Sequence, residues 1–209
     1  MSSGSLFIIS APSGAGKTTL VNALINNMNS YYSISRVVTY TSRSARLGEQ
    51  DGRDYHFISV SDFKDKIEQG FFIEWSDVYG TYYGSPRHIL KEVEQGHSRI
   101  LVIDRLGAAQ VAAQTDKAIL IWIYPPSLEV LELRLRKRGT DSDASIIKRM
   151  ELARLELAQE ADNPIYMHHI LNDFFEKALD SLEKIVKMML ENKKINIEKS
   201  PLNKAENQL

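Results

Sequence analysis

The sequence predicts an α/β fold with a central parallel sheet flanked by helices, and three observations support this prediction. A short apolar strand at residues 6–9 is followed by a glycine-containing loop and then by a predicted helix at residues 19–28. Predicted strands and helices alternate along most of the chain, which favours parallel strands joined by helical crossovers. Two later segments, residues 100–104 and 118–124, are continuous apolar runs, as expected for strands buried on both faces.

Composition excludes several classes of function. The chain has 209 residues, of which 43% are hydrophobic and 25% charged, so it can build a sizeable core. Its formal net charge of -1 gives no overall attraction to nucleic acid or to an anionic membrane. Cysteine is absent, which excludes disulfides, thiolate catalysis and Cys-based zinc sites and fits the reducing cytoplasm. No apolar run approaches about 18 residues and the N-terminus carries no basic region, so we expect neither a membrane span nor a signal peptide.

The loop after the first strand has the pattern of a P-loop. It reads Ala11-Pro12-Ser13-Gly14-Ala15-Gly16-Lys17-Thr18-Thr19, with Ala11 in place of the usual first glycine. Small residues let successive backbone N–H groups converge on phosphate oxygens, and the following helix N-terminus adds positive potential. The pattern predicts that residues 13–19 bind ATP, with Lys17 on the β- and γ-phosphates and the Thr18 hydroxyl on Mg²⁺.

A small, largely β lobe is predicted at residues 36–88, inserted after the first helix. Its expected elements are strands at residues 36–41, 55–58 and 71–75, a helix at residues 61–69 with Ser61 as N-cap, and a turn-rich segment at residues 79–84. The polar residues 42–52 between the first two strands are punctuated by glycine and predict a loop.

Polar side chains in this lobe are candidates for binding a phosphorylated acceptor. Arg43 and Arg46 lie in the loop, and Tyr55 and Tyr83 are hydroxyl donors that would complete a site for a phosphate dianion. Taken alone, the two arginines are more typical of a solvated loop face. Glu74 lies within an apolar strand, where a carboxylate either points to solvent or accepts hydrogen bonds from the edge of a buried ligand.

The second half of the chain completes the predicted sheet. We expect a helix from Pro86 to Gln95, a strand ending at the carboxylate of Asp104, a strand at residues 118–124, and a last strand at residues 167–171. Two arginine-rich helices, residues 127–138 and from about 143 to 161, are joined by a polar link, and an amphipathic helix spans residues 174–190. The division that follows is a core of residues 1–35, 89–126 and 162–190, an acceptor lobe of 36–88, a helix and lid of 127–161, and a frayed polar tail of 191–209.

From Leu6 to about Leu190 the sequence resembles guanylate kinases, P-loop kinases that transfer the γ-phosphate of ATP to GMP. Beside the P-loop, the segments that carry the resemblance are Arg43-Ser44-Ala45-Arg46-Leu47-Gly48-Glu49, Phe72-Ile73-Glu74-Trp75, Tyr82-Tyr83-Gly84-Ser85, Arg138-Gly139-Thr140-Asp141-Ser142 with Lys148-Arg149, and Asn172-Asp173. It implies a P-loop kinase with a β-rich acceptor lobe and a helical lid, ATP and GMP as substrates, and Mg²⁺ with the ATP.

The resemblance also implies roles for individual residues. Those that would bind GMP are Thr39, Arg43, Arg46, Tyr55, Glu74, Tyr83, Ser85 and Asp104. Those that would act in phosphoryl transfer are Lys17, Arg46, Arg138 and Arg149, and Asn172 and Asp173 would lie beside the adenine of ATP. Guanine carries a donor pair, N1–H and the 2-amino group, that one carboxylate accepts, so Glu74 has a physical reason to select guanine over adenine. Asp104 would contact the Mg²⁺ through water.

Three motifs depart from the family pattern in ways that bear on function. Ala45 replaces a proline, Val102 and Leu106 replace an aspartate and a glutamine, and Asp143-Ala144 replaces an acidic pair. These departures leave two alternatives open: a related P-loop kinase acting on another phosphorylated acceptor, such as a ribose bisphosphate, and a guanylate-kinase-like binding module that has lost catalysis. The intact Gly16-Lys17-Thr18 argues against the second. The sequence does not decide between a monomer and a homo-oligomer.

Overall fold

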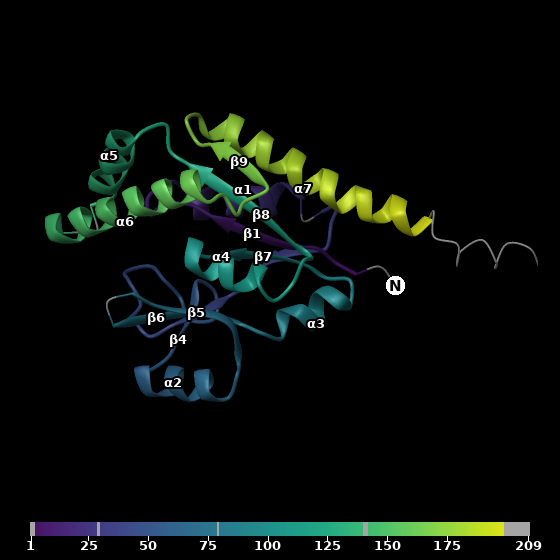
Figure 1. Cartoon of the computed structure of the whole chain (residues 1–209), viewed down its shortest axis with the longest axis horizontal. Coiled ribbons are helices and arrows are strands. Elements are labelled where there is room, and N and C mark those ends of the chain that lie inside the picture. Colours follow the sequence, from purple (N-terminus) through teal and green to yellow (C-terminus); the bar gives the residue numbers. More distant parts are fainter. Residues whose placement is uncertain (1–2, 29, 79, 140–141, 199–209) are drawn as a thin grey trace, which may run out of the picture.

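The main sheet has five strands, all parallel, in the order β2-β7-β1-β8-β9. Their bounds are Leu6–Ser10 for β1, Ile34–Arg36 for β2, Ser98–Val102 for β7, Ala118–Tyr124 for β8 and His168–Leu171 for β9. The computed structural model describes residues 3–28, 30–78, 80–139 and 142–198, with the side chains of residues 138 and 192–198 outside that description. The predicted parallel sheet is therefore confirmed (Figure 1).

Helices cover both faces of this sheet because alternate strand residues point to opposite sides. On one face, Phe7 and Ile9 belong to a core shared with the apolar sides of four helices. These are α1 (Lys17–Met28), α5 (Leu128–Arg138), α6 (Asp143–Asp162) and α7 (Phe175–Glu198). On the other face, Leu6 and Ile8 belong to a second core with α3 (Ile89–Glu94) and α4 (Arg105–Ala112). The sheet is thus the middle layer of three, as the sequence predicts.

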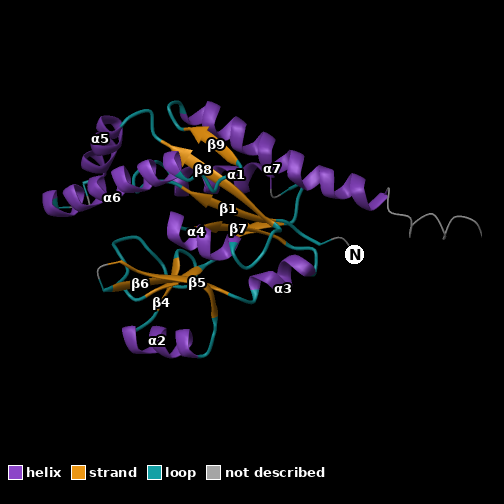
Figure 2. Cartoon of the chain, in the orientation of Figure 1, coloured by secondary structure: helices purple, strands orange, loops and turns teal. Residues whose placement is uncertain are grey.

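A second, smaller sheet has the strand order β4-β3-β6-β5. Its strands are β3 (Thr39–Thr41), β4 (Tyr55–Phe57), β5 (Phe72–Val78) and β6 (Thr81–Pro86), and α2 (Val60–Glu68) follows β4. The β3–β4 pair is parallel and the other two pairs are antiparallel. Figure 2 shows this sheet and α2 set apart from the main sheet. The predicted β-rich inserted lobe is therefore a separate layer with its own aromatic core, in which Phe63 stacks on Phe72 at 4.5 Å between ring centroids.

The small sheet is held to the main body through helix α4. Gln110 on α4 accepts from the backbone N–H of Trp75 at 3.1 Å and donates to its carbonyl at 2.9 Å. A glutamine amide can pair with an edge strand in this way because it carries both a donor and an acceptor. The edge strand β5 is thereby fixed against the helix that follows β7, which brings residues 74–78 close to the ends of the main-sheet strands.

The strand predicted at residues 36–41 is wrong as a single element. Arg36 ends β2 in the main sheet opposite Ile100, whereas Thr39 begins β3 in the small sheet opposite Tyr55. Residues 37–38 link the two sheets. Both halves are extended, so the local pattern of β-branched residues gives the conformation correctly but carries no information about which partner each half pairs with.

The turn-rich segment predicted at residues 79–84 is also wrong, because residues 81–86 form strand β6. Gly84 favours a turn by local propensity, but a side chain there would lie 2.9 Å from the Phe72 ring and 3.0 Å from the Phe63 ring. The glycine is thus required by aromatic packing within a strand rather than by a turn. Pro86 consequently ends a strand and does not open a helix, and α3 begins at Ile89.

Further boundaries differ from the prediction. Strand β5 runs from Phe72 to Val78 rather than over residues 71–75, and α1 begins at Lys17 rather than at residue 19. Helix α4 was not predicted, and Asp104 is its N-cap rather than the end of a strand, since β7 ends at Val102. The N-cap of α2 is Ser59, whose hydroxyl accepts from the N–H of Asp62, and not Ser61. Helix α7 continues to Glu198, so residues 191–198 are helical rather than frayed. The rest of the predicted tail, 199–209, lies outside the described residues.

The predicted absence of a membrane span agrees with the helices that the structure describes. Over the described ranges, none combines the length and the apolar character that a bilayer crossing requires.

Candidate functional site

The P-loop connects β1 to α1 at the carboxyl edge of the main sheet. Gly14 and Gly16 have φ angles of +93° and +91°, which L side chains rarely adopt. A side chain at residue 16 would also lie 2.6 Å from Nδ2 of Asn172, which donates to the Ala15 carbonyl at 2.7 Å. The glycines therefore determine the shape of the P-loop. Asn172, in the loop that follows β9, holds the P-loop in place through this hydrogen bond.

Lys17 begins α1 and lies near carboxylates from other parts of the fold. Its Nζ donates to the Ala11 carbonyl at the mouth of the loop. Burial lowers the pKa of its ammonium, while the nearby Glu156 and Asp104 act in the opposite direction. Without a phosphate, the cation is balanced by these two carboxylates. A bound triphosphate would supply the negative charge that this buried ammonium otherwise takes from the protein.

Glu156 was not identified from the sequence. It is buried on α6, and burial raises its pKa to about 7. The buried positions of this helix are Ile146, Met150, Ala153, Glu156 and Glu160. Their spacing of three and four residues marks one face of the helix. A carboxylate on this otherwise apolar face was the signal in the sequence that could have identified Glu156.

A cavity of about 200 Å³ joins the P-loop to the small sheet. Lys17 and Thr18 border it on the P-loop side. From the small sheet and the adjoining strand end come Thr39, Tyr55, Glu74, Ser76, Val78, Tyr83, Gly84, Val102, Ile103 and Asp104. Most of the GMP-binding residues proposed from the sequence therefore share one cavity with the P-loop lysine and threonine, although they come from different strands and loops.

Glu74 is buried on β5 with a relative exposure of 4%, so the solvent-facing alternative is wrong. The hydroxyl of Ser85, on the neighbouring strand β6, donates to its Oε1. Its Oε2 lies over Gly107, where a Cβ atom would approach it to 2.6 Å. Burial and then the nearby Asp104 raise the pKa of this carboxyl to about 7. Ser85 is fully buried and orients Glu74 through this hydrogen bond. It is not among the described residues that line the cavity.

Asp104 connects the main body to the small sheet. Its Oδ1 accepts from the N–H of Gly107 at 2.7 Å and caps α4. Its Oδ2 accepts from the hydroxyl of Ser76, on β5, at 3.3 Å. Ser76 was not identified from the sequence, although its position two residues after Glu74 places it on the same face of the strand.

The two arginines of the acceptor loop are organised by Glu49. Arg43 forms a two-pronged pair with this carboxylate, at 2.6 and 2.8 Å, and its guanidinium lies 5.1 Å from the centroid of the Tyr55 ring. The hydrogen bonds from Arg43 lower the pKa of Glu49 to about 2. Glu49 also accepts from the backbone N–H of Arg46 at 2.8 Å. Neither arginine is among the described residues that line the cavity. Arg43 nevertheless stacks on Tyr55, which does line it.

The predicted lid residues are placed only in part. Arg149 on α6 donates to the Ser13 hydroxyl of the P-loop at 2.7 Å. The side chain of Arg138, at the end of α5, lies outside the described residues, as do residues 140–141 of the link. Asp173 is exposed beside Asn172. One predicted lid arginine therefore reaches the P-loop.

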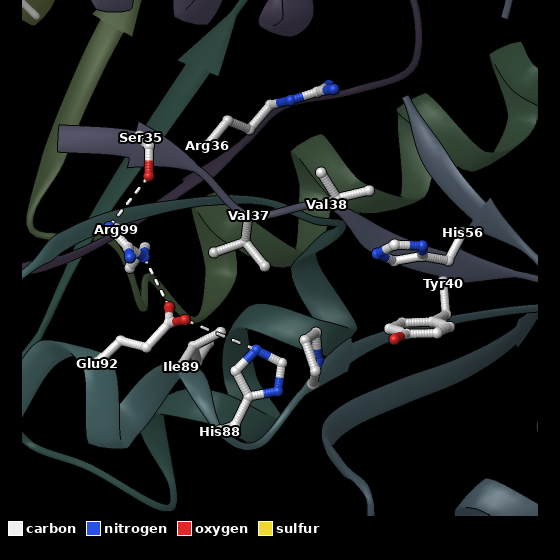
Figure 3. Close-up of a pocket in the computed structure, with 11 residues that line it drawn as sticks. Ser35, Arg36, Val37, Val38, Tyr40, His56, His88, Ile89, Glu92 and Arg99 are labelled. Carbon is white, nitrogen blue, oxygen red and sulfur yellow. Dashed lines mark hydrogen bonds and ion pairs between the residues drawn. The ribbon is translucent and has the colours of Figure 1, made fainter. Parts of the chain in front are cut away.

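A second hollow, of about 260 Å³, lies where the small sheet joins the main body (Figure 3). Its lining includes Val37, Val38, Pro86 and His88, which belong to both chain connections between the sheets. Figure 3 shows Arg99 between Ser35 and Glu92, to which it is bound at 3.1 and 2.7 Å. This hollow therefore marks the junction between the two sheets and is distinct from the cavity at the P-loop.

Comparison with known proteins gives consistent matches. A family model described as guanylate kinase matches residues 3–189. A guanylate kinase of Cupriavidus metallidurans is 42% identical over 184 residues, covering 88% of this chain and 82% of that protein. One from Maricaulis maris is 45% identical over 186 residues, with coverage of 88% and 82%. The crystal structure of guanylate kinase from Anaplasma phagocytophilum matches with a TM-score of 0.73 and 30% identity over 90% of this chain and 87% of that one.

Proposed function

Because the chain belongs to the guanylate kinase family and is an ATP:GMP phosphotransferase, we propose that ATP and GMP meet in the cavity between the P-loop and the small sheet. The observation that carries this proposal is that Lys17 and Thr18 line the same cavity as Glu74 and Tyr83. The donor phosphates would lie on the P-loop and the acceptor nucleotide against the small sheet. The γ-phosphoryl group would then pass from ATP to a phosphate oxygen of GMP, giving ADP and GDP.

In this proposal the guanine lies against Glu74, with Thr39 and Asp104 beside it. The ionised carboxylate accepts from N1–H and from the 2-amino group, and adenine offers no such donor pair. Ser85 orients the carboxylate from behind. The buried position of Glu74 supports this role, because a carboxylate without a ligand pays a desolvation cost there that a pair of donors would offset.

The GMP phosphate is assigned to the hydroxyls of Tyr55 and Tyr83 and to the guanidinium groups of Arg43 and Arg46. The Glu49 pair leaves Arg43 in a fixed orientation on the Tyr55 ring, so it is preorganised at the edge of the cavity. Arg46 is then the more mobile cation, and it would contact the reacting phosphates as the loop closes.

Phosphoryl transfer needs positioning and charge stabilisation more than a general base. Lys17 would hold the β- and γ-phosphates, and Arg138 and Arg149 would bring further positive charge from the lid. The contact of Arg149 with Ser13 supports this, since it already directs a lid cation to the P-loop. Asn172 and Asp173 would border the adenine of ATP.

The residues present also fit a Mg²⁺ ion bound with ATP. The Thr18 hydroxyl and the Asp104 carboxylate line the same cavity, and oxygen is the ligand that this ion prefers. The described residues contain no cluster of three acidic or histidine side chains that would hold a metal by themselves. Such an ion would be held mainly by the phosphates of ATP, and Thr18 and, through water, Asp104 are the residues of this chain that would help to hold it. Bound there, Mg²⁺ would neutralise charge on the transferring phosphates.

The division into core (1–35, 89–126 and 162–190), acceptor lobe (36–88) and lid (127–161) is part of the same proposal. Two chain connections join the small sheet to the main body, and both border the hollow in Figure 3. Rotation about these connections would bring the acceptor lobe toward the P-loop and exclude water. A cytoplasmic location is proposed because a chain without cysteine fits a reducing compartment.

A coupled assay of ADP release with GMP, dGMP, AMP and ribose phosphates as acceptors tests the residue assignment. We expect GMP to be the preferred acceptor and AMP to be used poorly, because Glu74 cannot pair with adenine. Equal use of GMP and AMP would show that Glu74 does not select the base.

A further inference from the structure

We propose that Ser76 is a positioning residue that holds Asp104 toward the guanine and so determines recognition of the 2-amino group. The proposal rests on the assignment of the cavity to GMP. On β5 the alternate residues Glu74, Ser76 and Val78 line the cavity, whereas Trp75 and Asp77 are exposed on the other face. Ser76 is buried, with a relative exposure of 4%, and lines the same cavity as Glu74 and Lys17.

The two oxygens of Asp104 are held by different elements. Oδ1 is bound to the N-terminus of α4 through Gly107, and Oδ2 is bound to the Ser76 hydroxyl across the gap between the main body and the small sheet. Rotation about the last side-chain torsion of an aspartate moves both oxygens, so a single hydrogen bond restrains it only loosely. The hydroxyl of Ser76 adds a second contact at the other oxygen, which narrows this rotation and holds Oδ2 at the cavity.

The direction of this hydrogen bond determines what the cavity wall can bind. A serine hydroxyl has one proton, and here it donates that proton to Asp104. Toward a ligand, the Ser76 oxygen therefore has only lone pairs to offer, and so do the carboxylates of Asp104 and Glu74 when both are ionised. This wall accepts hydrogen bonds and donates none. Glu74 accepts two of the N–H hydrogens on the guanine edge, from N1 and from the 2-amino group. The second hydrogen of the 2-amino group remains, and this wall can accept it.

The test compares GMP with IMP, which lacks the 2-amino group but keeps N1–H. Ser76→Ala is expected to raise the KM for GMP about tenfold, the effect of losing one hydrogen bond to a charged group. The kcat/KM for IMP should change by less than about twofold, so that the preference for GMP over IMP falls. Ser76→Thr keeps the hydroxyl and should restore the preference, because strands accept β-branched residues.

Ser98→Ala is the matched control. Ser98 is also a buried strand serine, at 5% exposure, and it accepts one hydrogen bond, from the Ser5 N–H, at the other end of β7. It should lower the melting temperature without changing the GMP to IMP ratio. If Ser76→Ala lowers the melting temperature and leaves that ratio unchanged, its role is structural only and the proposal is wrong.

A double-mutant cycle with Asp104→Asn tests whether Ser76 acts through Asp104. Asparagine is as good an N-cap as aspartate, so this variant keeps α4 capped while removing the charge. We expect Asp104→Asn to lower the GMP to IMP ratio and Ser76→Ala to have less than about a twofold further effect in that background. Additive effects would overturn the proposal while leaving Asp104 in the GMP site. No effect of Asp104→Asn alone would overturn both the proposal and the assignment of Asp104.

Discussion

The carboxyl of Glu74 makes the stability of the nucleotide-free protein depend on pH, and Glu74→Gln should remove that dependence. The pKa of Glu74 is raised from 4.5 to about 7, first by burial and then by Asp104. Between these values the folded protein binds a proton that the unfolded chain has lost, so the free energy of unfolding falls as the pH rises. Above about pH 7 the folded protein carries a buried charge, and the full cost is present.

The size of the effect follows from the two pKa values. A change from 4.5 to about 7 corresponds to roughly 3 kcal/mol, at about 1.36 kcal/mol per pH unit. Between pH 5 and pH 8 the free energy of unfolding of the wild type should fall by about 2.5 kcal/mol relative to Glu74→Gln. Glutamine keeps an oxygen to accept from Ser85 and does not titrate, so the variant should gain relative stability as the pH rises.

The measurement is urea unfolding of both proteins at several pH values from 5 to 8, with EDTA and without nucleotide. Glu156, whose pKa is also raised to about 7, is present in both proteins, and its contribution cancels in the difference. A difference in stability that stays constant across this range would refute the reasoning, because it would mean that Glu74 ionises at its ordinary pKa. The same ionisation should make guanosine bind more tightly as the pH rises through 7, and guanosine avoids the titration of the GMP phosphate.

Three other changes test separate parts of the site. Lys17→Ala should lower kcat at least a hundredfold in the coupled assay. Thermal unfolding should change little, because the substitution removes the desolvation cost of the buried ammonium together with its attraction to Glu156 and Asp104; near-normal turnover would contradict the assignment. Gly107→Ala should lower kcat/KM for GMP and leave the KM for ATP unchanged, because the new Cβ would lie 2.6 Å from Oε2 of Glu74; φ at this glycine is not positive, so an equal loss with both substrates would point to a general disturbance of α4 instead. Glu49→Gln should raise the KM for GMP by releasing Arg43, at every pH used for the assay because a pKa of about 2 keeps the wild-type carboxylate ionised, and an unchanged KM would show that Arg43 needs no fixed orientation. X-ray scattering with a bisubstrate analogue should show compaction relative to the free protein, and identical curves would argue against closure of the acceptor lobe.

Features that depend on local pattern are predictable from the amino-acid sequence. The P-loop, with its glycines at residues 14 and 16, was predictable because its backbone conformation and its ligand both require those residue types. The strand at residues 118–124 was predicted with its correct bounds because a continuous apolar run rich in isoleucine, bounded by polar residues and by prolines, is typical of a strand buried on both faces. The α/β class followed from the order of such elements along the chain.

Which residues meet depends on how distant segments of the chain pack together. The chain around residues 36–41 is extended throughout, but pairing with Ile100 assigns one end to the main sheet and pairing with Tyr55 assigns the other to the small sheet. Gly84 favours a turn by local propensity, but it lies in β6 because it pairs with Tyr40 and Trp75, and the Phe63 and Phe72 rings leave no room there for a side chain. These outcomes depend on contacts between distant segments, which local propensity does not contain.

The same distinction applies to the candidate site. The sequence identified Glu74 and Asp104 as separate carboxylates, but it did not place them against one helix N-terminus or identify Ser76 and Glu156 as their neighbours. A side chain on a strand or helix has a periodic direction that the sequence does predict. Whether that direction leads to solvent, to a cavity or to another charge depends on what packs against the element, and burial then sets the pKa of each group. The residue types were therefore fixed by the sequence, whereas their protonation and their hydrogen-bond partners were fixed by the packing of the small sheet and α6 around the P-loop.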